Sequence, residues 1–398
     1  MALVNVIGLG YIGLPTALML ASHGVQVVGT DYNASLVETL NKGKTTFSEE
    51  GLDELFVRAV EAGIRFSTEY QSTDVYIVSV PTPYDKDSKK IDPCHVVAAV
   101  NKILTICPEN ATIVIESTVS PGTMDRYVRP LCTGRLVELV HAPERIIPGN
   151  MLYELEHNSR TIGADSPAVG EKIREIYSSF CKGEIVVTDI KTAEMTKVIE
   201  NTYRAVNIAF ANELAKLCHS ENMDVEEIRR ICNMHPRVNI LAPGPGVGGH
   251  CIPVDPWFLV GDYPAHTPLI AKAMEINEQM PDYIYDRICR LMEEKGITDF
   301  SRVGLYGLTY KEDVDDVRES PTLQLLHRHG QAFSVYDPMV TRPMVDGQYT
   351  DFISFLENVE LVVLMVGHSH IRRNEKSLEG KWIFDTRNIL KNVPTYRL

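Results

Sequence analysis

Short apolar runs separated by amphipathic stretches shape the first half of the chain. Residues 2–7 form an apolar run of the kind that becomes a buried strand, and it leads through residues 8–13 into an apolar helical stretch that ends near His23. A second apolar run follows at residues 25–29. This order predicts a strand, a glycine-rich turn, a helix and a second strand, which make a right-handed βαβ unit.

The same alternation continues downstream. Further apolar runs at residues 75–80, 112–116 and 136–139 predict three more buried strands, and helical patterns separate them. Strands that alternate with helices are typical of a mostly parallel sheet with helices on both faces. Residues 1–190 are therefore expected to form one doubly wound α/β domain.

A second α/β pattern occupies the end of the chain, so residues 299–398 are expected to form a smaller domain of the same type. A helix is predicted at residues 321–329. The strands are predicted at residues 303–306, 332–336, 361–366 and 383–385.

The region between these domains has helical patterning. Residues 192–221 contain neither glycine nor proline and predict one helix, roughly 45 Å long. A helix of that length exceeds one compact layer, so we expect it to bridge domains or to build a dimer interface. Further helices are predicted at residues 225–233 and 268–295, with a break at Pro281. The expected fold class is α/β: two Rossmann-like doubly wound domains joined by a central helical domain, residues 191–298.

Composition narrows the function classes. The chain has 398 residues, 44% of them hydrophobic, and a net charge of −14 without any long Lys/Arg block, so no nucleic-acid partner is expected. No apolar run approaches the ~18 residues that span a bilayer, and a first strand beginning near Leu3 leaves no room for a signal peptide. A cytoplasmic location is expected. The eight cysteines form no CxxC pair, so neither a metal site nor a disulfide framework is indicated.

The glycine-rich turn predicts a dinucleotide site. Gly8 permits a tight turn, Gly10 lets the backbone approach a pyrophosphate, and Gly13 lets the helix pack on the strand. Asp31, 18 residues beyond Gly13, could accept hydrogen bonds from a ribose diol and would repel a 2′-phosphate. This favours NAD over NADP. The alternative is a glycine turn that binds no ligand.

Residues 243–258 are the most informative stretch for chemistry. Four glycines between residues 244 and 249 leave a loop that side chains cannot crowd, and Cys251 follows directly. His250 and Asp255 are close in sequence, and a thiol reacts as the thiolate that a neighbouring base or cation favours. A catalytic nucleophile is expected at Cys251. The alternative is a small buried cysteine in a turn.

Lys197 and Asn201 are four residues apart on the long predicted helix, so their side chains point the same way. Taken by itself, such a lysine is most often a surface charge. An inward-facing pair could instead hold an oxyanion and a water molecule.

Taken together, the motifs resemble the UDP-glucose/GDP-mannose dehydrogenase family, the NAD-dependent 6-dehydrogenases of nucleotide sugars. The resemblance runs essentially from end to end. It rests on the loop GLGYIGLP at 8–15, VPTP at 80–83, ESTVSPGT at 116–123, PER at 143–145, Lys197 with Asn201, the GxGGxCxxxD pattern that ends at Asp255, and the segments 307–311 and 316–320.

The resemblance implies a four-electron oxidation through a covalent intermediate. Cys251 would attack the C6 aldehyde to give a thiohemiacetal and then a thioester, while Lys197 and Asn201 stabilise the oxyanion. Asp255 would order Lys197 or a water molecule. Glu144 would serve the hydrolytic step, and Thr118 would position the water.

The resemblance also implies the binding residues and a homodimer, with Arg237 reaching a substrate site across the dimer interface and Lys311 the phosphate side of the substrate. The cofactor residues would be Gly8, Gly10, Tyr11, Ile12, Gly13, Asp31, Pro81, Thr82, Thr118 and Arg318. The residues that contact the UDP-sugar would be Glu144, Arg145, Lys197, Asn201, Arg237, Gly248, His250 and Lys311.

Within the family, residues 235–240 and the run GVGGHCIPVDPWF at 246–258 are most similar to UDP-N-acetyl-D-mannosamine dehydrogenases, which make precursors of cell-surface polysaccharides. The pair Trp257-Phe258 is the weakest discriminator. A UDP-N-acetylglucosamine 6-dehydrogenase is the first alternative. A two-electron dehydrogenase of the 6-phosphogluconate or hydroxyacyl-CoA type requires neither the cysteine loop nor the last domain, and an inactive nucleotide sensor would not need the set of polar residues around Cys251.

Overall fold

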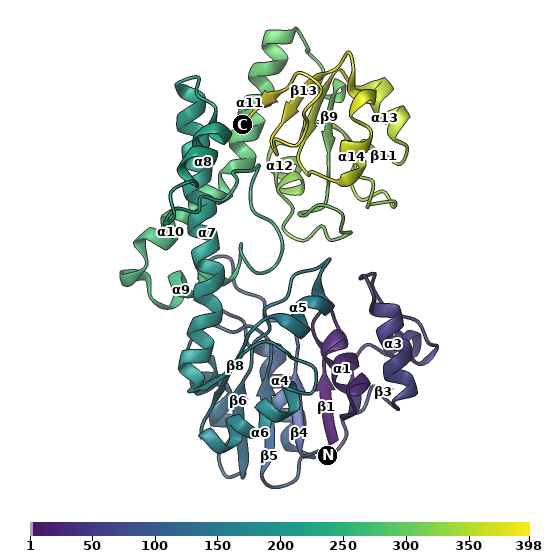
Figure 1. Ribbon diagram of the computed structural model, residues 1–398, viewed down its shortest axis with the longest axis vertical. Helices are drawn as coiled ribbons and strands as arrows, with labels where there is room; N and C mark the ends of the chain where they lie inside the picture. The colour runs from purple at the N-terminus through teal and green to yellow at the C-terminus, as the bar shows by residue number, and fades with distance from the viewer. Residues whose placement is uncertain (1–2) are drawn as a thin grey trace. The chain divides into compact units, whose positions relative to one another are not determined.

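The structure is a computed structural model and describes residues 3–398, so Ala2 of the first predicted strand lies outside the described residues. The chain divides into two compact units, Met1–Glu200 and Asn201–Leu398, called unit 1 and unit 2 below. The 31-residue helix α7 (Ile190–Ser220) begins in unit 1 and continues into unit 2 (Figure 1). The bounds of the three predicted domains remain a prediction.

Unit 1 is built on an eight-stranded sheet with the order β3-β2-β1-β4-β5-β6-β7-β8. The first six of these strands are mutually parallel, and β7 runs antiparallel to β6. Their bounds are β1 (Leu3–Ile7), β2 (Gln26–Thr30), β3 (Arg65–Ser67), β4 (Val75–Val78), β5 (Ala111–Ile115), β6 (Val137–His141), β7 (Arg160–Ala164) and β8 (Ile185–Thr188).

Helices pack on this sheet because the strands between them are apolar on both faces. Every residue of β4 and β5 is buried, which is typical of a parallel sheet covered on both sides. The helices are α1 (Gly13–Ser22), α2 (Ala34–Asn41), α3 (Leu52–Glu61), α4 (Cys94–Leu104), α5 (Met151–His157) and α6 (Pro167–Tyr177), with short turns η1 (Met124–Val128) and η2 (Arg129–Cys132).

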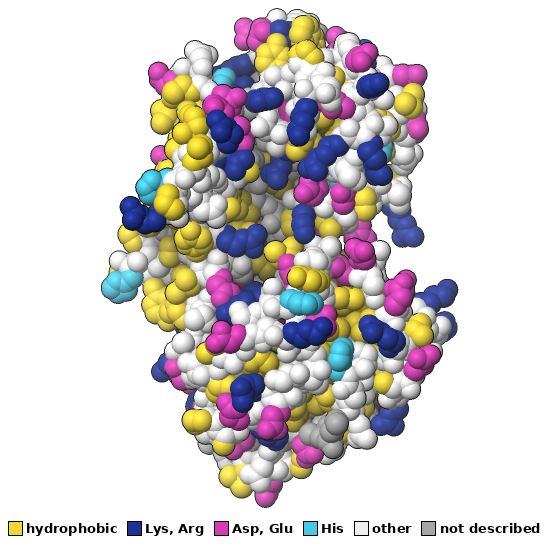
Figure 2. Space-filling model, in the orientation of Figure 1, with side chains coloured by type: hydrophobic (Ala, Val, Ile, Leu, Met, Phe, Trp, Pro, Cys, Tyr) yellow, Lys and Arg dark blue, Asp and Glu magenta, His cyan; other side chains and the backbone are white. Residues whose placement is uncertain are grey.

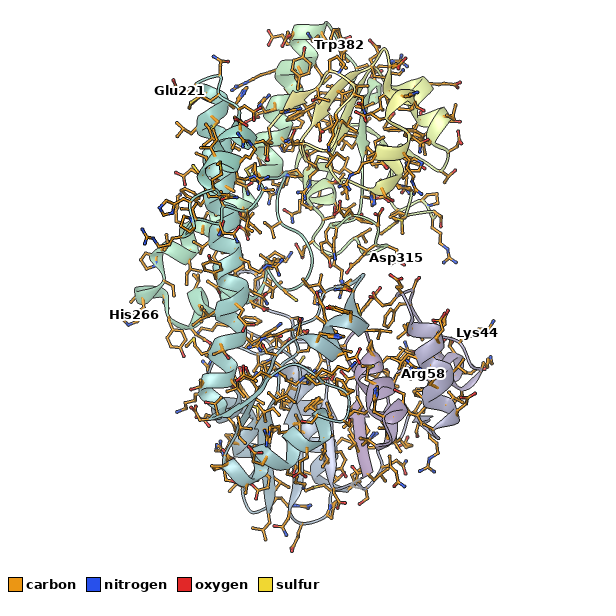
Figure 3. All side chains as sticks on the ribbon, viewed as in Figure 1. Lys44, Arg58, Glu221, His266, Asp315 and Trp382 are labelled. Atoms are coloured by element: carbon orange, nitrogen blue, oxygen red, sulfur yellow. The ribbon has the colours of Figure 1, made fainter. Side chains whose placement is uncertain are left out.

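The helices that follow match the expected pattern closely. The predicted long helix is confirmed as α7, whose end near Glu221 is marked in Figure 3. The predicted break near Pro281 is also confirmed, since Pro281 lies in the first turn of α11, where its missing N–H has no helical partner to lose. The bounds are α8 (Val225–Cys232), α9 (Asp255–Asp262), η3 (Pro264–His266), α10 (Pro268–Glu278) and α11 (Met280–Lys295).

Unit 2 contains a six-stranded, wholly parallel sheet with the order β11-β10-β9-β12-β13-β14. This order repeats that of the first six strands of unit 1, so the expected pair of doubly wound sheets is confirmed. Its elements are η4 (Phe300–Arg302), β9 (Val303–Tyr306), α12 (Pro321–His329), β10 (Ser334–Tyr336), β11 (Gln348–Tyr349), α13 (Phe352–Asn358), β12 (Leu361–Leu364), α14 (Ser369–Arg373), η5 (Glu375–Leu378), β13 (Trp382–Asp385) and β14 (Tyr396–Arg397).

The strands that the apolar pattern did not predict are β3, β7, β8, β11 and β14. Most are short or peripheral, and β7 begins with a charged residue, Arg160, that is nonetheless buried. The three shortest, β3, β11 and β14, do not stand out as apolar runs, whereas β8 has the apolar sequence IVVT and was missed. Within residues 3–398, no helix combines the length and apolar character needed to cross a membrane.

Candidate active site

The glycine-rich turn of unit 1 has the shape that a dinucleotide requires. Gly8 has a φ of +88°, and a Cβ there would lie 2.5 Å from the carbonyl oxygen of Ser79. A Cβ on Gly13 would lie 1.8 Å from the carbonyl oxygen of Gly8, whereas one on Gly10 would meet nothing within 4 Å. Gly8 and Gly13 are thus needed for packing, and the exposed Gly10 leaves the backbone open to a pyrophosphate.

Asp31 lies beside this turn, directly after β2. Its Oδ2 accepts a hydrogen bond from the backbone N–H of Leu9 at 2.8 Å, and its Oδ1 accepts one from Asn33 at 2.9 Å. A carboxylate oxygen can accept more than one hydrogen bond, so Asp31 can still receive the hydroxyls of a ribose. Beyond it, the ring of Tyr11 packs on that of Phe47 with centroids 4.4 Å apart. The turn and Asp31 together fit NAD.

A buried polar network lies behind the turn, and the sequence analysis missed it. The fully buried Glu116 accepts hydrogen bonds from Arg160 at 2.8 Å, from the Tyr177 hydroxyl at 3.1 Å and from the Ser79 hydroxyl at 2.7 Å. Burial and the charge of Glu116 raise the pKa of Tyr177 well above its usual value. The network therefore holds Ser79 in place beneath Gly8. A glutamate at the end of the apolar run 112–116 was the available signal.

The two loops that follow β4 and β5 are joined to each other. The Thr82 hydroxyl donates to the carbonyl oxygen of Thr118 at 2.7 Å, and the Ser117 hydroxyl donates to that of Val80 at 2.6 Å. Both loops leave the carboxyl ends of neighbouring parallel strands. The structure thus brings together Pro81, Thr82 and Thr118, three residues predicted to contact the cofactor.

Lys197 is buried, with 6% of its surface exposed, and so is Asn201, with 7%, which supports the inward-facing arrangement over the surface one. The Lys197 ammonium lies 3.7 Å from a carboxylate oxygen of Glu144, which is also buried. The other oxygen of Glu144 accepts from the backbone N–H of Ile146 at 2.5 Å. A carboxylate at this distance offsets part of the cost of burying an ammonium.

His141 was not predicted as a site residue, although it ends β6 close to this pair. It is fully buried, and its Nδ1 lies 3.0 Å from the carbonyl oxygen of Ile115. Burial, together with the charge of Lys197, lowers the pKa of His141 to about 3. The ring is therefore neutral at physiological pH and adds no second positive charge beside Lys197.

Arg145 is held by other residues of unit 1. Its guanidinium makes a two-point contact with Glu200, at 2.9 Å and 2.6 Å, and also donates to Ser159 and Thr161. This arrangement anchors the loop that carries Glu144. The substrate contact expected for Arg145 remains a prediction.

In unit 2, Asn201 and Asp255 hold the turn that carries Cys251. The Asn201 amide donates to Oδ2 of Asp255 at 2.7 Å, and both side chains are buried. The backbone N–H of Asp255 donates to the carbonyl oxygen of Cys251 at 2.8 Å, so the cysteine lies in the turn that opens α9. Cys251 is half-buried and takes part in no disulfide bond. The pair Trp257-Phe258 is buried in α9.

The glycines before Cys251 permit a close contact with the segment that carries Lys311. A Cβ on Gly248 would lie 2.4 Å from Cβ of Tyr310, and one on Gly249 would lie 3.0 Å from the Tyr310 ring. The N–H of Gly249 donates to the carbonyl oxygen of Arg318 at 2.8 Å. Figure 3 marks Asp315 on this extended segment, residues 307–320. The cysteine loop and this segment therefore form one assembly within unit 2.

The remaining predicted residues occupy different surroundings. His250 and Lys311 are half-buried, and the Arg318 guanidinium makes a two-point contact with Asp316. Arg237 is exposed, and its guanidinium has no hydrogen-bond or ion-pair partner within residues 3–398. The roles predicted for these side chains remain predictions.

Comparison with known proteins agrees with this geometry. Three models of the UDP-glucose/GDP-mannose dehydrogenase family match the chain: the NAD binding domain at residues 2–181, the central domain at 191–279 and the UDP binding domain at 304–392. The UDP-N-acetyl-D-mannosamine dehydrogenase of Methanococcus aeolicus is 40% identical over 98% of this chain and 92% of its own length.

Two further relatives have similar sequence identity and coverage. An NDP-N-acetyl-D-galactosaminuronic acid dehydrogenase of Ralstonia nicotianae is 37% identical over 97% of this chain and 96% of its own length. The solved structure of the UDP-N-acetylmannosamine dehydrogenase of Pyrococcus horikoshii is 34% identical, with a TM-score of 0.92 over 99% of this chain and 98% of that one. The chain therefore belongs to the UDP-glucose/GDP-mannose dehydrogenase family, the NAD-dependent dehydrogenases of nucleotide sugars.

Proposed function

We propose that the protein oxidises the C6 alcohol of UDP-N-acetyl-D-mannosamine to the carboxylate, in two oxidations that pass through a thioester at Cys251. The observation that carries the proposal is the placement of Cys251, half-buried at the start of α9, in a turn held by the hydrogen-bonded pair Asn201 and Asp255. The relatives named UDP-N-acetylmannosamine dehydrogenase support this choice of sugar.

The turn at Gly8–Gly13 and the carboxylate of Asp31 would hold NAD, which accepts a hydride in each oxidation. The open backbone at Gly10 suits the pyrophosphate, and Asp31 suits the ribose diol. The joined loops at Thr82 and Thr118 would complete this side of the site. An NADP 2′-phosphate would meet the negative charge of Asp31.

Cys251 would add to the aldehyde that the first oxidation produces. The thiolate sulfur bonds to C6, and the carbonyl oxygen becomes an oxyanion that Lys197 and Asn201 stabilise. Loss of the second hydride converts this thiohemiacetal into a thioester. A simple alcohol dehydrogenase needs no thiol, so this step explains why a cysteine stands here.

Hydrolysis of the thioester would use the acidic residues. Glu144 would take a proton from the attacking water, which Thr118 positions, and the sulfur leaves as the thiolate. Asp255 accepts a hydrogen bond from Asn201 and would keep the Asn201 amide oriented. Buried and paired, Glu144 is set in one position by its contact with Ile146.

The nucleotide part of the substrate would lie against unit 2. Lys311 would contact the diphosphate, and Gly248 and His250 would line the sugar side, because the loop at 246–250 packs directly on Tyr310. Arg318 would face the cofactor. Arg237 is exposed, which suits its proposed contact with a substrate bound to the other subunit of a homodimer.

The surface of α7 supports that homodimer. Tyr203, Phe210 and Leu217 are spaced by seven residues on one face of the helix, and 63%, 56% and 55% of their respective surfaces are exposed. On or after α8, Ile231 and Met234 are exposed as well, and Figure 2 shows hydrophobic side chains over α7 and α8. An apolar strip along a helix is typical of surfaces that pack against another protein, which supports the proposed homodimer. The cytoplasmic location remains a prediction.

Counting the NADH formed tests the mechanism. Purified protein with UDP-N-acetyl-D-mannosamine and excess NAD should yield two NADH for each sugar consumed, and Cys251→Ala should form no acid. Cys232→Ala, which changes another half-buried thiol of unit 2, should keep the wild-type yield. One NADH per sugar with accumulating aldehyde, or normal turnover by Cys251→Ala, would contradict the thioester route.

The choice of sugar is tested by running UDP-N-acetylmannosamine, UDP-N-acetylglucosamine and UDP-glucose side by side. The highest kcat/KM is expected for UDP-N-acetylmannosamine. A higher value for UDP-N-acetylglucosamine would leave the mechanism in place and change the substrate.

A further inference from the structure

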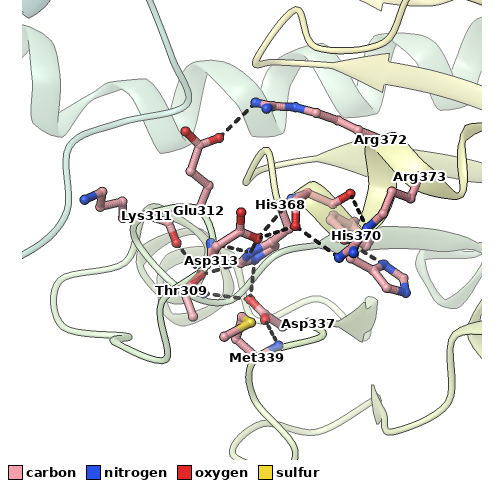
Figure 4. Close-up of polar contacts among 12 residues, drawn as sticks. Thr309, Lys311, Glu312, Asp313, Asp337, Met339, His368, His370, Arg372 and Arg373 are labelled. Carbon is pink, nitrogen blue, oxygen red and sulfur yellow. Dashed lines mark hydrogen bonds and ion pairs between the residues drawn. The ribbon is translucent and has the colours of Figure 1, made fainter. Parts of the chain in front are cut away.

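A cluster of buried polar side chains lies at the carboxyl end of the sheet of unit 2, and the mechanism above does not use it. His368 is fully buried and Asp337 has 2% of its surface exposed. Both lie against residues 308–313, the segment that carries Lys311 (Figure 4). The cluster therefore concerns the part of unit 2 to which the diphosphate contact is assigned.

Asp337 holds the start of this segment through backbone hydrogen bonds. One of its carboxylate oxygens accepts the backbone N–H groups of Leu308 at 2.5 Å and Thr309 at 2.9 Å, and faces Nε2 of His368 at 3.2 Å. Its other oxygen accepts from the N–H of Met339 at 2.7 Å. Burial acts to raise the pKa of Asp337, but these hydrogen bonds outweigh it and hold the pKa below its usual value.

His368 holds the end of the segment through a hydrogen bond to its backbone. Its Nδ1 accepts the backbone N–H of Asp313 at 3.0 Å. A ring nitrogen that accepts from an amide carries no proton, so the proton of the neutral ring is on Nε2, where it faces the Asp337 carboxylate. A single tautomer thus satisfies both sides of the ring and links Asp337 to Asp313.

Lys311 lies between these two attachments. The Thr309 hydroxyl donates to the carbonyl oxygen of Lys311 at 2.9 Å, and this hydroxyl is 3.3 Å from Nε2 of His368. Asp313 has a φ of +56°, a conformation that a residue other than glycine keeps only when its surroundings hold it. Its carboxylate also accepts from the N–H of Ser369 at 3.0 Å. The side chain of Lys311 extends away from the cluster (Figure 4).

We propose that His368 and Asp337 are positioning residues for nucleotide-sugar binding, which fix residues 308–313 so that Lys311 points at the diphosphate. Neither side chain touches the substrate. Lys311 has a long, flexible side chain, so its affinity for phosphate depends on how firmly its backbone is held. The inference rests on the role assigned to Lys311 under the proposed function.

Two substitutions of His368 separate its two hydrogen bonds. His368→Gln can retain a donor at the Nε2 position toward Asp337 but removes the acceptor for Asp313. His368→Asn can retain an acceptor near the Nδ1 position but removes the donor to Asp337. His370→Gln is the matched control, because His370 lies two residues away on α14 and contacts the Tyr306 hydroxyl at 3.1 Å.

The measurement is calorimetric titration of the full-length protein with UDP, together with the KM values for UDP-sugar and NAD. His368→Gln should weaken UDP binding about tenfold, equivalent to about 1.4 kcal/mol, and raise KM for the UDP-sugar while KM for NAD stays unchanged. His368→Asn should lose less affinity, since it still holds Asp313. His370→Gln should bind UDP as the wild type does.

Thr309→Val provides a second route if the histidine variants fold poorly, because it preserves shape and removes only the hydroxyl that holds the Lys311 carbonyl. It should also weaken UDP binding. Lys311→Gln separates the positioning role of His368 from the phosphate contact of Lys311. Loss of UDP binding in Lys311→Gln, with wild-type binding in His368→Gln and Thr309→Val, would overturn the positioning role alone. Wild-type binding in Lys311→Gln would overturn the assignment of Lys311 and this inference with it.

Discussion

The two sheets share a strand order, yet they use the acidic residue after their second strand in opposite ways. In unit 1, Asp31 follows β2 and accepts one backbone N–H at each oxygen, from Leu9 and from Asn33. In unit 2, Asp337 follows β10 at the corresponding place and accepts two backbone N–H groups and the His368 ring on one oxygen alone.

The first turn of each sheet contains a similar glycine, but the chain that follows it differs. Gly8 and Gly307 both have positive φ values, +88° and +107°, and each donates its N–H to the strand next to it. After Gly8 the chain enters α1 at Gly13, whereas after Gly307 it makes a long excursion before α12 begins at Pro321. The larger number of donors on Asp337 suits that excursion, because its carboxylate holds the start of the longer segment in place.

The largest expected effect concerns the network behind the first turn. Glu116→Ala should lower the free energy of unfolding by about 3–5 kcal/mol, because it leaves the guanidinium of Arg160 buried without its partner. Chemical denaturation followed by circular dichroism measures the loss. A loss of less than about 1 kcal/mol would mean that the Glu116–Arg160 pair does not stabilise unit 1.

A smaller effect separates Asp31 from Asp337. Asp337→Ala should cost about 2–3 kcal/mol of stability, since four donors lose their acceptor in a buried place. Asp31→Ala should cost under about 1 kcal/mol but raise the KM for NAD about tenfold, the value of a lost hydrogen bond to a charged group. Thermal unfolding and initial rates at varied NAD distinguish the two. Equal stability losses with an unchanged KM for NAD would mean that Asp31 and Asp337 play the same structural role.

A dependence of stability on pH is expected from the buried histidine of unit 1. His141 has a folded pKa of about 3, below the ordinary value of 6.5, so the unfolded chain takes up a proton that the folded chain does not. The stability that the neutral His141 contributes is fully present above pH 6.5 and is lost as pH falls toward 3. Over that range the free energy of unfolding falls by up to about 1.4 kcal/mol per pH unit.

Denaturation midpoints of the wild type and of His141→Asn between pH 7 and pH 4 check this slope. The variant should show a flatter dependence on pH, whatever its stability at pH 7. Parallel curves would mean that His141 does not carry the effect.

Local pattern was sufficient for most of the fold. The predicted α12 matches the structure at both ends, and the predicted β9 matches likewise, because each is an apolar or amphipathic run between clear turn residues. The network of Glu116 could not be predicted, since Glu116 and Arg160 meet only once β5 and β7 share a sheet. The sequence likewise did not predict whether Lys197 is buried, because its spacing from Asn201 suits both a surface pair and an inward-facing pair.

The helix α7 also fixes the distance and the rotation between two site residues. Lys197 and Asn201 are separated by four steps of about 1.5 Å and about 100°, which places their heads in phase. Removing or adding a single residue between them would rotate Asn201 by about 100° and take its amide out of reach of Asp255. Among members of this family, differences in chain length should therefore accumulate in loops, while this stretch of helix changes its outward residues but not its count.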